Sequence, residues 1–117
     1  MSFSYTVITD DDFIQEVVKC LTPTVAFFVA KWSANCHIME PIIANLAKRF
    51  EGQIKFCKVD ADNARAIIRA YGITELPTLL FFASGTPQSH IKGVASESEI
   101  SKEIESLLVS KPRKGRG

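Results

Sequence analysis

The feature that most constrains the fold is a run of six apolar residues from Val25 to Ala30. The run is continuous rather than alternating and rich in β-forming residues, which predicts a central strand covered on both faces. It leads into the hexapeptide from Trp32 to His37 (WSANCH) and then into a long amphipathic segment, Ile38 to Phe50. A strand therefore runs into a helix N-terminus, where free N–H groups and the helix dipole favour an anion.

Apolar periodicity and turn residues predict the other elements. Strands are expected at Phe3–Ile8, Gln53–Val59, Thr78–Ala83 and Ser89–Val94, and helices at Thr9–Thr22, Ala64–Ala70 and after Ser96, with a turn at Ser84–Pro87. In the helix that follows the hexapeptide, the expected inner stripe is Ile38, Ile42, Ile43, Leu46, Ala47 and Phe50, with a kink at Pro41. Alternating strands and helices predict a parallel core, to which the last hairpin adds antiparallel strands. We expect an α/β protein in which four helices flank a mixed five-stranded sheet.

Length and charge limit the classes of function. A chain of 117 residues, 46% hydrophobic and 23% charged, predicts one globular domain, which we place at residues 1–110. The net charge of +1 predicts no general attraction to nucleic acid or membrane. Residues 111–117 carry four basic side chains without apolar periodicity, and we expect a disordered tail there. We find no apolar run of the roughly 18 residues that a membrane-spanning helix needs, and we expect a cytoplasmic monomer.

The three cysteines do not form a disulfide framework, because their number is odd and their spacings are wide. Cys20 and Cys57 are expected to be core or sub-surface thiols, with a disulfide between them as the alternative. Cys36 is either a working thiol, favoured by its place in the first turn of a helix, or a half-buried side chain that packs as a small hydrophobe. His37 is expected on the solvated helix surface, and the spacing of these residues predicts no metal site.

Several motifs along the chain together resemble the thioredoxin family over roughly residues 3 to 109. They are the Val25–Ala30 strand, the Trp32-x-x-x-Cys36 turn, Pro41, the run from Lys58 to Asp62, the run from Tyr71 to Thr78, and Gly93. The resemblance implies a thioredoxin-like three-layer α/β/α sandwich without a cofactor. It also implies a cis peptide bond before Pro77 and a Leu76-Pro77 loop that faces the Trp32–Cys36 turn.

The resemblance also shows where this chain departs from the family. Thioredoxins carry Trp-Cys-Gly-Pro-Cys, in which the first cysteine attacks a disulfide and the second resolves the mixed disulfide. Here Ser33 stands at the attacking position and Cys36 at the resolving one. Phe27 stands where the family places a buried aspartate as proton acceptor, while the lysine partner of that acid is present as Lys58. Because a serine hydroxyl cannot attack a disulfide at neutral pH, we expect no dithiol–disulfide oxidoreductase activity at this site.

Three hypotheses for function follow. The first is a redox-degenerate module that binds a protein partner in the thioredoxin substrate groove, formed by Trp32, Leu76, Pro77, Lys92 and Gly93. The second is a monothiol redox protein, in which Cys36 forms a mixed disulfide with glutathione or a partner thiol, or senses oxidation. The third is a residual protein-disulfide reductase that pairs Cys36 with Cys20, Cys57 or a thiol of another protein. Ser33 itself is expected to cap the helix that follows it.

Overall fold

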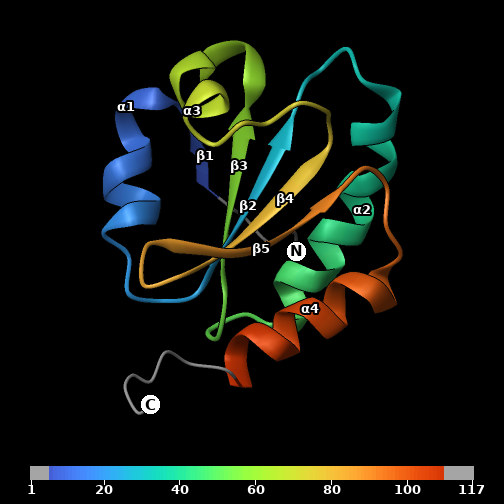
Figure 1. Ribbon diagram of the computed structural model, residues 1–117. Helices are drawn as coiled ribbons and strands as arrows, with labels where there is room; N and C mark the ends of the chain where they lie inside the picture. The colour runs from blue at the N-terminus through green and yellow to red at the C-terminus, as the bar shows by residue number, and fades with distance from the viewer. Residues whose placement is uncertain (1–5, 110–117) are drawn as a thin grey trace.

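The computed structural model describes residues 6–109 and contains a five-stranded sheet with helices on both sides (Figure 1). The strands are β1 (Thr6–Ile8), β2 (Thr24–Val29), β3 (Lys55–Asp60), β4 (Thr78–Ala83) and β5 (Thr86–Lys92). The helices are α1 (Asp10–Phe13), η1 (Ile14–Val18), α2 (Ala34–Arg49), η2 (Ala61–Asn63), α3 (Arg65–Ala70) and α4 (Glu97–Val109). The predicted strand start at Phe3, the domain end at residue 110 and the basic tail at residues 111–117 lie outside the described residues.

The sheet has the order β1-β3-β2-β4-β5, with β2 at its centre. Strands β1, β3 and β2 are mutually parallel, and β4 and β5 run antiparallel to their neighbours. All six residues of β2 are buried, as the continuous apolar run predicted. The mixed five-stranded α/β/α architecture is therefore confirmed, and so is the cis peptide bond between Leu76 and Pro77.

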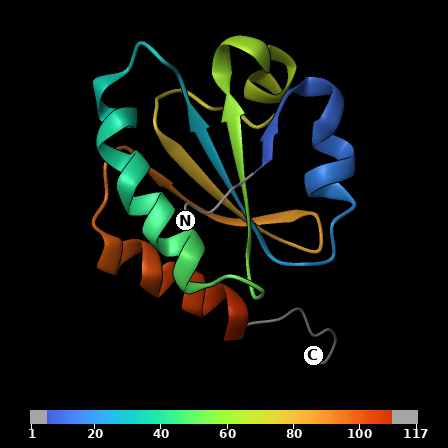
Figure 2. The same cartoon turned by 180° about the vertical axis from the view of Figure 1, so that it is seen from behind.

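Alternation along the strands divides the core between the two faces of the sheet. Phe27 of β2 and Phe81 of β4 point towards α2 and α4, where they join the first apolar cluster. Phe28 and Phe82, one residue further along each strand, join the second cluster beneath α1, η1 and α3. The helices accordingly lie in two layers on opposite sides of the sheet (Figure 2). Any side chain on β2 or β3 is thereby assigned to one face by its position in the strand.

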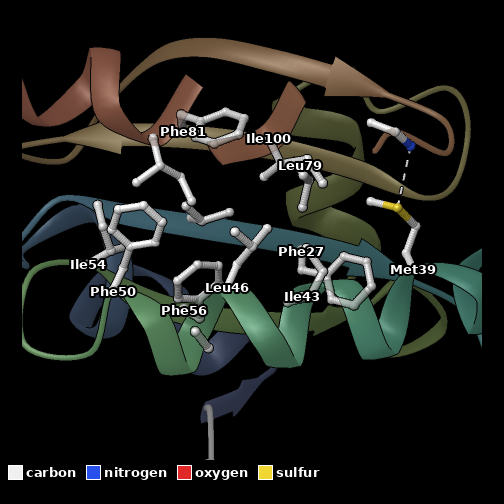
Figure 3. Packing of buried hydrophobic residues seen from close by; sticks show 14 of the residues in the cluster. Phe27, Met39, Ile43, Leu46, Phe50, Ile54, Phe56, Leu79, Phe81 and Ile100 are labelled. Carbon is white, nitrogen blue, oxygen red and sulfur yellow. Dashed lines mark hydrogen bonds between the residues drawn. The ribbon is translucent and has the colours of Figure 1, made fainter. Parts of the chain in front are cut away.

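Helix α2 buries most of the predicted stripe, including Ile43, Leu46 and Ala47, but the N-terminal part of the stripe differs from the prediction. Ile38, expected to point inward, is 53% exposed, whereas Met39 is fully buried. The inward stripe starts at Cys36 and continues through Met39, Ile43, Leu46 and Ala47. Met39 lies among the core side chains, and its Sδ accepts a hydrogen bond from the backbone amide of Ala95 at 3.5 Å (Figure 3). Adjacent apolar residues at 38 and 39 left the phase of the stripe ambiguous in the sequence, and it is Met39 that packs in the core cluster.

The first helix and the last hairpin also differ from expectation. The segment predicted as one helix to Thr22 is α1 followed by the π-helix η1, and the Lys19 amide bonds the Ile14 carbonyl five residues back. The hairpin turn is shorter than predicted and consists of Ser84 and Gly85, whose positive φ values of 51° and 80° are typical of two-residue hairpins. Strand β5 therefore starts at Thr86, and Pro87 is accommodated because β5 is an edge strand.

Gly85 provides a test of how tightly this hairpin packs against η1. A Cβ atom at Gly85 would come within 2.1 Å of the Val18 carbonyl oxygen, whereas one at Gly52 would meet nothing within 4 Å. Both glycines have positive φ, at 80° and 87°. We expect Gly52→Ala to lower the free energy of unfolding by about 1 kcal/mol through backbone strain alone. Gly85→Ala should lower it by roughly 3 kcal/mol or more, because the clash adds to the strain.

Urea denaturation of the two variants beside the parent protein measures this difference. Equal losses of stability in Gly85→Ala and Gly52→Ala would contradict the close packing of the hairpin against Val18.

Candidate functional site

The turn that leaves β2 is organised by Ser33. The Ser33 amide donates to the Ala30 carbonyl at 3.1 Å, which closes the turn after the strand. The Ser33 side-chain oxygen accepts a hydrogen bond from the Cys36 amide at 3.3 Å, and Ser33 is the N-cap of α2. The predicted capping role is confirmed. The Ser33 hydroxyl therefore satisfies one of the free amides of the helix start.

Cys36 lies in the first turn of α2 and faces inward. The residue is only 2% exposed and belongs to the cluster between the sheet and helices α2 and α4. Phe27, at the position where the resemblance implied a buried aspartate, is fully buried in the same cluster. The sulfur therefore lies among apolar side chains, a setting in which a thiol packs as a small hydrophobe.

Lys58 is adjacent to Phe27 across the β2–β3 pair and points to the same face of the sheet. Its Nζ forms an ion pair with Oε2 of Glu40 at 2.5 Å, and both side chains are about three-tenths exposed, at 27% and 31%. Glu40 comes from α2, one turn after Cys36. The carboxylate that accompanies Lys58 is thus supplied by the helix, and the sequence analysis missed it. No local spacing links residues 40 and 58, so only packing of α2 on the sheet could reveal the pair.

Trp32 lines a cavity beside this turn. Its side chain is 72% exposed, and its Nε1 donates a long hydrogen bond of 3.4 Å to Asp62. The cavity has a volume of about 220 Å³ and is lined by Trp32, Ala61, Ile68, Ile73, Thr74, Glu75 and Leu76. We call it the Trp32 cavity. Trp32 and Leu76, two of the five predicted groove residues, are thereby brought together as expected, in a largely apolar setting.

The other three predicted groove residues lie differently. Pro77 is buried, and its carbonyl accepts a hydrogen bond from the Gly93 amide at 2.8 Å, so these two residues join the cavity loop to the end of β5. Lys92 is exposed and lines a second cavity of about 140 Å³. Its lining residues are Tyr71, Gly72, Ile73, Thr74, Thr78, Leu80, His90 and Lys92. His90 was not singled out from the sequence, although alternation in a strand predicts that it shares a face with Lys92.

Polar residues near the turn have structural partners. His37 is exposed, as predicted, and its Nε2 lies 2.9 Å from the Lys31 carbonyl oxygen. Asp60 accepts hydrogen bonds from the Asp62 amide and the Asn63 side chain, both at 3.0 Å, which agrees with a capping role. Within residues 6–109, no group of three or more His, Cys, Asp or Glu residues could hold a metal ion. The same part of the chain contains no helix that is long and apolar enough to cross a membrane.

The remaining two cysteines lie away from the turn. All three cysteines are free, so the alternative Cys20–Cys57 disulfide is absent. Cys57 is fully buried in the cluster beneath α1 and α3, on the face of the sheet opposite to Cys36. Burial raises the pKa of the Cys57 thiol to about 11, against a smaller lowering by Lys55. The sheet itself separates Cys57 from Cys36, and Cys57 is held in its neutral form.

Lys55 lies on the same face as Cys57 and forms an ion pair with Glu16 at 2.7 Å. It also donates to the Glu16 backbone carbonyl at 2.8 Å. Burial by itself lowers the pKa of Lys55, but its hydrogen bond to Glu16 and nearby acidic groups outweigh this, so that the pKa is raised. This ion pair joins the middle of η1 to the start of β3, and neither residue lines the Trp32 cavity.

Comparison with known proteins agrees with the fold and the motifs. The thioredoxin family model matches residues 4–106. Thioredoxin 1 of Nostoc sp. is 32% identical over 101 residues, which cover 86% of this chain and 94% of that protein. Thioredoxin of Pyropia yezoensis is 29% identical with the same coverage of each chain. Thioredoxin M-type, chloroplastic, of Zea mays is 33% identical over 80% of this chain and 56% of its own length.

The chloroplastic relatives also bear on length and location. The chain spans a little over half the length of the M-type relatives from Zea mays and Pisum sativum. The names of these relatives place them in the chloroplast, so a cytoplasmic location for this chain stays a prediction.

The burial of Cys36 leads to a prediction on thiol reactivity. In the native protein, a thiol reagent such as dithiobis-nitrobenzoate should react rapidly with Cys20, which is partly exposed, and not with the buried Cys36 or Cys57. Cys36→Ser should leave the number of fast-reacting thiols in the native protein unchanged and lower only the number of thiols that react in denaturant. Cys20→Ser, as the matched control, should remove the fast phase. Loss of the fast phase in Cys36→Ser would contradict the buried geometry.

The raised pKa of Cys57 leads to a prediction at alkaline pH. An unfolded chain loses this proton near the ordinary value of 9.0, whereas the folded protein keeps it to about 11. Between these values the unfolded state binds fewer protons, so the free energy of unfolding falls as pH rises, by about 2–3 kcal/mol from this group. Lys55, whose pKa is also raised, acts in the same direction.

Denaturant unfolding at pH 8 and near pH 11, in the parent protein and in Cys57→Ala, isolates the contribution of the thiol. Cys57→Ala is less stable at pH 8, because the substitution leaves a cavity in the core, but its free energy of unfolding should fall less with rising pH than that of the parent protein. An identical pH dependence in both proteins would contradict the assignment to Cys57.

Proposed function

Because the chain belongs to the thioredoxin family, we propose that it is a redox-degenerate member that binds an extended segment of a protein partner beside Trp32, without turning over disulfides. The observation that carries this proposal is the contrast in exposure between Trp32 and Cys36, which lie four residues apart. Trp32 is 72% exposed at the Trp32 cavity, whereas Cys36 is 2% exposed. The surface that can touch a partner is therefore apolar and aromatic, and the sulfur is withdrawn from it.

The chemistry of Ser33 supports the same proposal. Disulfide exchange requires a thiolate that attacks one sulfur of the substrate and then leaves from a mixed disulfide. A serine hydroxyl forms no disulfide, and the Ser33 oxygen already accepts the Cys36 amide at the start of α2. The thioredoxin family model matches residues 4–106, and the relative named thioredoxin 1 is 32% identical to this chain. The proposal is that this chain keeps the substrate groove implied by the thioredoxin resemblance, with a serine at the position of the attacking cysteine.

The two redox alternatives have less support in the geometry. A mixed disulfide at Cys36, with glutathione or a partner thiol, requires access to a sulfur that is enclosed by the first apolar cluster. A residual reductase that used Cys57 would need a sulfur on the opposite face of the sheet, held in its neutral form. Cys20 follows η1 in the chain, and η1 packs on that same opposite face. The resolving partner would then have to come from another protein.

The mode of binding follows from the lining of the Trp32 cavity. An apolar side chain of the partner would be buried between Trp32, Ile73 and Leu76, where both sides lose water-exposed apolar surface. The partner backbone would lie extended beside the Leu76-Pro77 loop, where pairing with main-chain groups adds affinity without demanding a particular sequence. Exposed tryptophans at such places are frequent sources of most of the binding energy.

We expect Trp32→Ala and Leu76→Asp to weaken capture of extended peptides at least tenfold, because the first removes a wall of the Trp32 cavity and the second introduces a charge into it. The measurement is selection of peptides from a displayed library on the parent protein, followed by affinity titration of the selected peptides on each variant. Leu21→Ala is the matched control, because Leu21 is 84% exposed and lies on the connection before β2. Thermal melting of every variant checks that the fold is retained.

Two outcomes would overturn the proposal. Undiminished capture by folded Trp32→Ala and Leu76→Asp would show that the Trp32 cavity is not the docking surface. Sustained turnover of a protein disulfide by the parent protein, with a thioredoxin-type electron donor, would show that Ser33 has not abolished reductase activity.

A further inference from the structure

The second cavity, which Lys92 and His90 line, lies next to the Trp32 cavity. The two cavities share Ile73 and Thr74, in the loop that joins α3 to β4. A segment that crosses this loop would therefore meet both cavities in succession. We call the second one the His90–Lys92 cavity.

The register of the β4–β5 pair explains why both basic residues face this cavity. Lys92 is opposite Thr78 and His90 is opposite Leu80. Leu80 belongs to the cluster beneath α1 and α3, so His90 and Lys92 project from the same face of the sheet. Both side chains are exposed, and β5 is the edge of the sheet. Two basic side chains thus lie on one face of β5, and the cavity that they line adjoins the largely apolar Trp32 cavity, whose lining contains no basic residue.

We propose that the protein segment bound in the Trp32 cavity carries an aspartate or glutamate whose carboxylate is bound by Lys92 and His90. This inference rests on the proposed function and specifies the chemistry of the partner. Lys92 supplies an ammonium group, and the imidazole of His90 supplies an N–H donor in either charge state. The pairing of one apolar and one basic cavity favours a partner with an apolar side chain followed or preceded by an acidic one.

Glu75, in the same loop, carries a charge opposite to that of Lys92 and therefore allows a second test of the inference. Its side chain lines the Trp32 cavity, and its Oε2 lies 3.4 Å from the position that a Cβ on Gly93 would occupy, directly after Lys92. A negative charge here repels an acidic partner side chain. Removal of the Glu75 charge should therefore strengthen binding of an acidic partner segment, whereas removal of the Lys92 charge should weaken it.

The experiment uses synthetic extended peptides in a serine and threonine background. Each peptide carries one leucine and, at each spacing and order in turn, one glutamate, with matched peptides in which glutamine or lysine replaces the glutamate. Affinities are measured at low and high salt on the parent protein. We expect the best glutamate peptide to bind roughly three- to tenfold more tightly than its glutamine counterpart at low salt, with the preference shrinking as salt screens the charges.

The variants assign that preference to residues. Lys92→Gln and His90→Gln should each reduce the preference for glutamate over glutamine, and Glu75→Gln should increase it. Lys102→Gln, the same change at an exposed lysine of α4, is the matched control and should leave the preference unchanged. Binding of the glutamine peptide should be unaffected by Lys92→Gln, which separates loss of charge recognition from loss of fold.

The outcomes separate this inference from the proposed function. Peptides that depend on Trp32 but bind equally with glutamate and glutamine would overturn the inference and leave the docking surface standing. A preference that persists in Lys92→Gln and His90→Gln would overturn it as well. Competition by inorganic phosphate without any preference among the peptides would assign the His90–Lys92 cavity to a free anion and overturn it. Absence of binding by every peptide would overturn both proposals.

Discussion

The burial of strand β2 on both faces is the constraint on which the rest of the structure depends. Its six residues are all buried, between β3 on one side and β4 on the other. Such a strand has no solvated face, so helices must cover the sheet from above and below. The chain leaves the C-terminal end of this strand at the turn that holds Trp32 and the Ser33 cap, beside the Trp32 cavity. The position of the candidate site is thus a consequence of the core.

Alternation on the strands then distributes the chemistry of the chain. Phe27 and Lys58 face α2, where Glu40 meets the lysine, whereas Cys57 faces the opposite helices. Cys57 and Lys58 are adjacent in β3, but they point to opposite faces of the sheet, so the buried neutral thiol and the Lys58–Glu40 ion pair lie on different sides. This separation leaves Cys36 without a second thiol on its own side of the sheet within the described residues. The capping role of Ser33, the burial of Cys36 and the exposure of Trp32 are each consistent with the proposed binding surface.

Much of the architecture could be predicted because it depends on patterns local to the chain. The apolar run of β2 and the alternation of strands and helices led to the correct five-stranded sheet, and the predicted Ser33 cap is present. Local patterns were insufficient where two adjacent apolar residues competed, so Ile38 was expected inside and Met39 was buried instead. They were also insufficient for the length of the hairpin turn, in which Gly85 lies close to the backbone of Val18, a residue far away in sequence.

By itself, the sequence determined the type and order of the elements, the absence of a thiol at residue 33 and the presence of a phenylalanine at residue 27. These are properties of residue identity and short-range periodicity, which need no knowledge of distant neighbours. Only the tertiary structure decided that Cys36 is enclosed, that Glu40 pairs with Lys58, and that Lys92 joins His90 beside a separate cavity. Each of these depends on which segments, remote in the chain, pack against each other, because burial and charge pairing are set by neighbours in space.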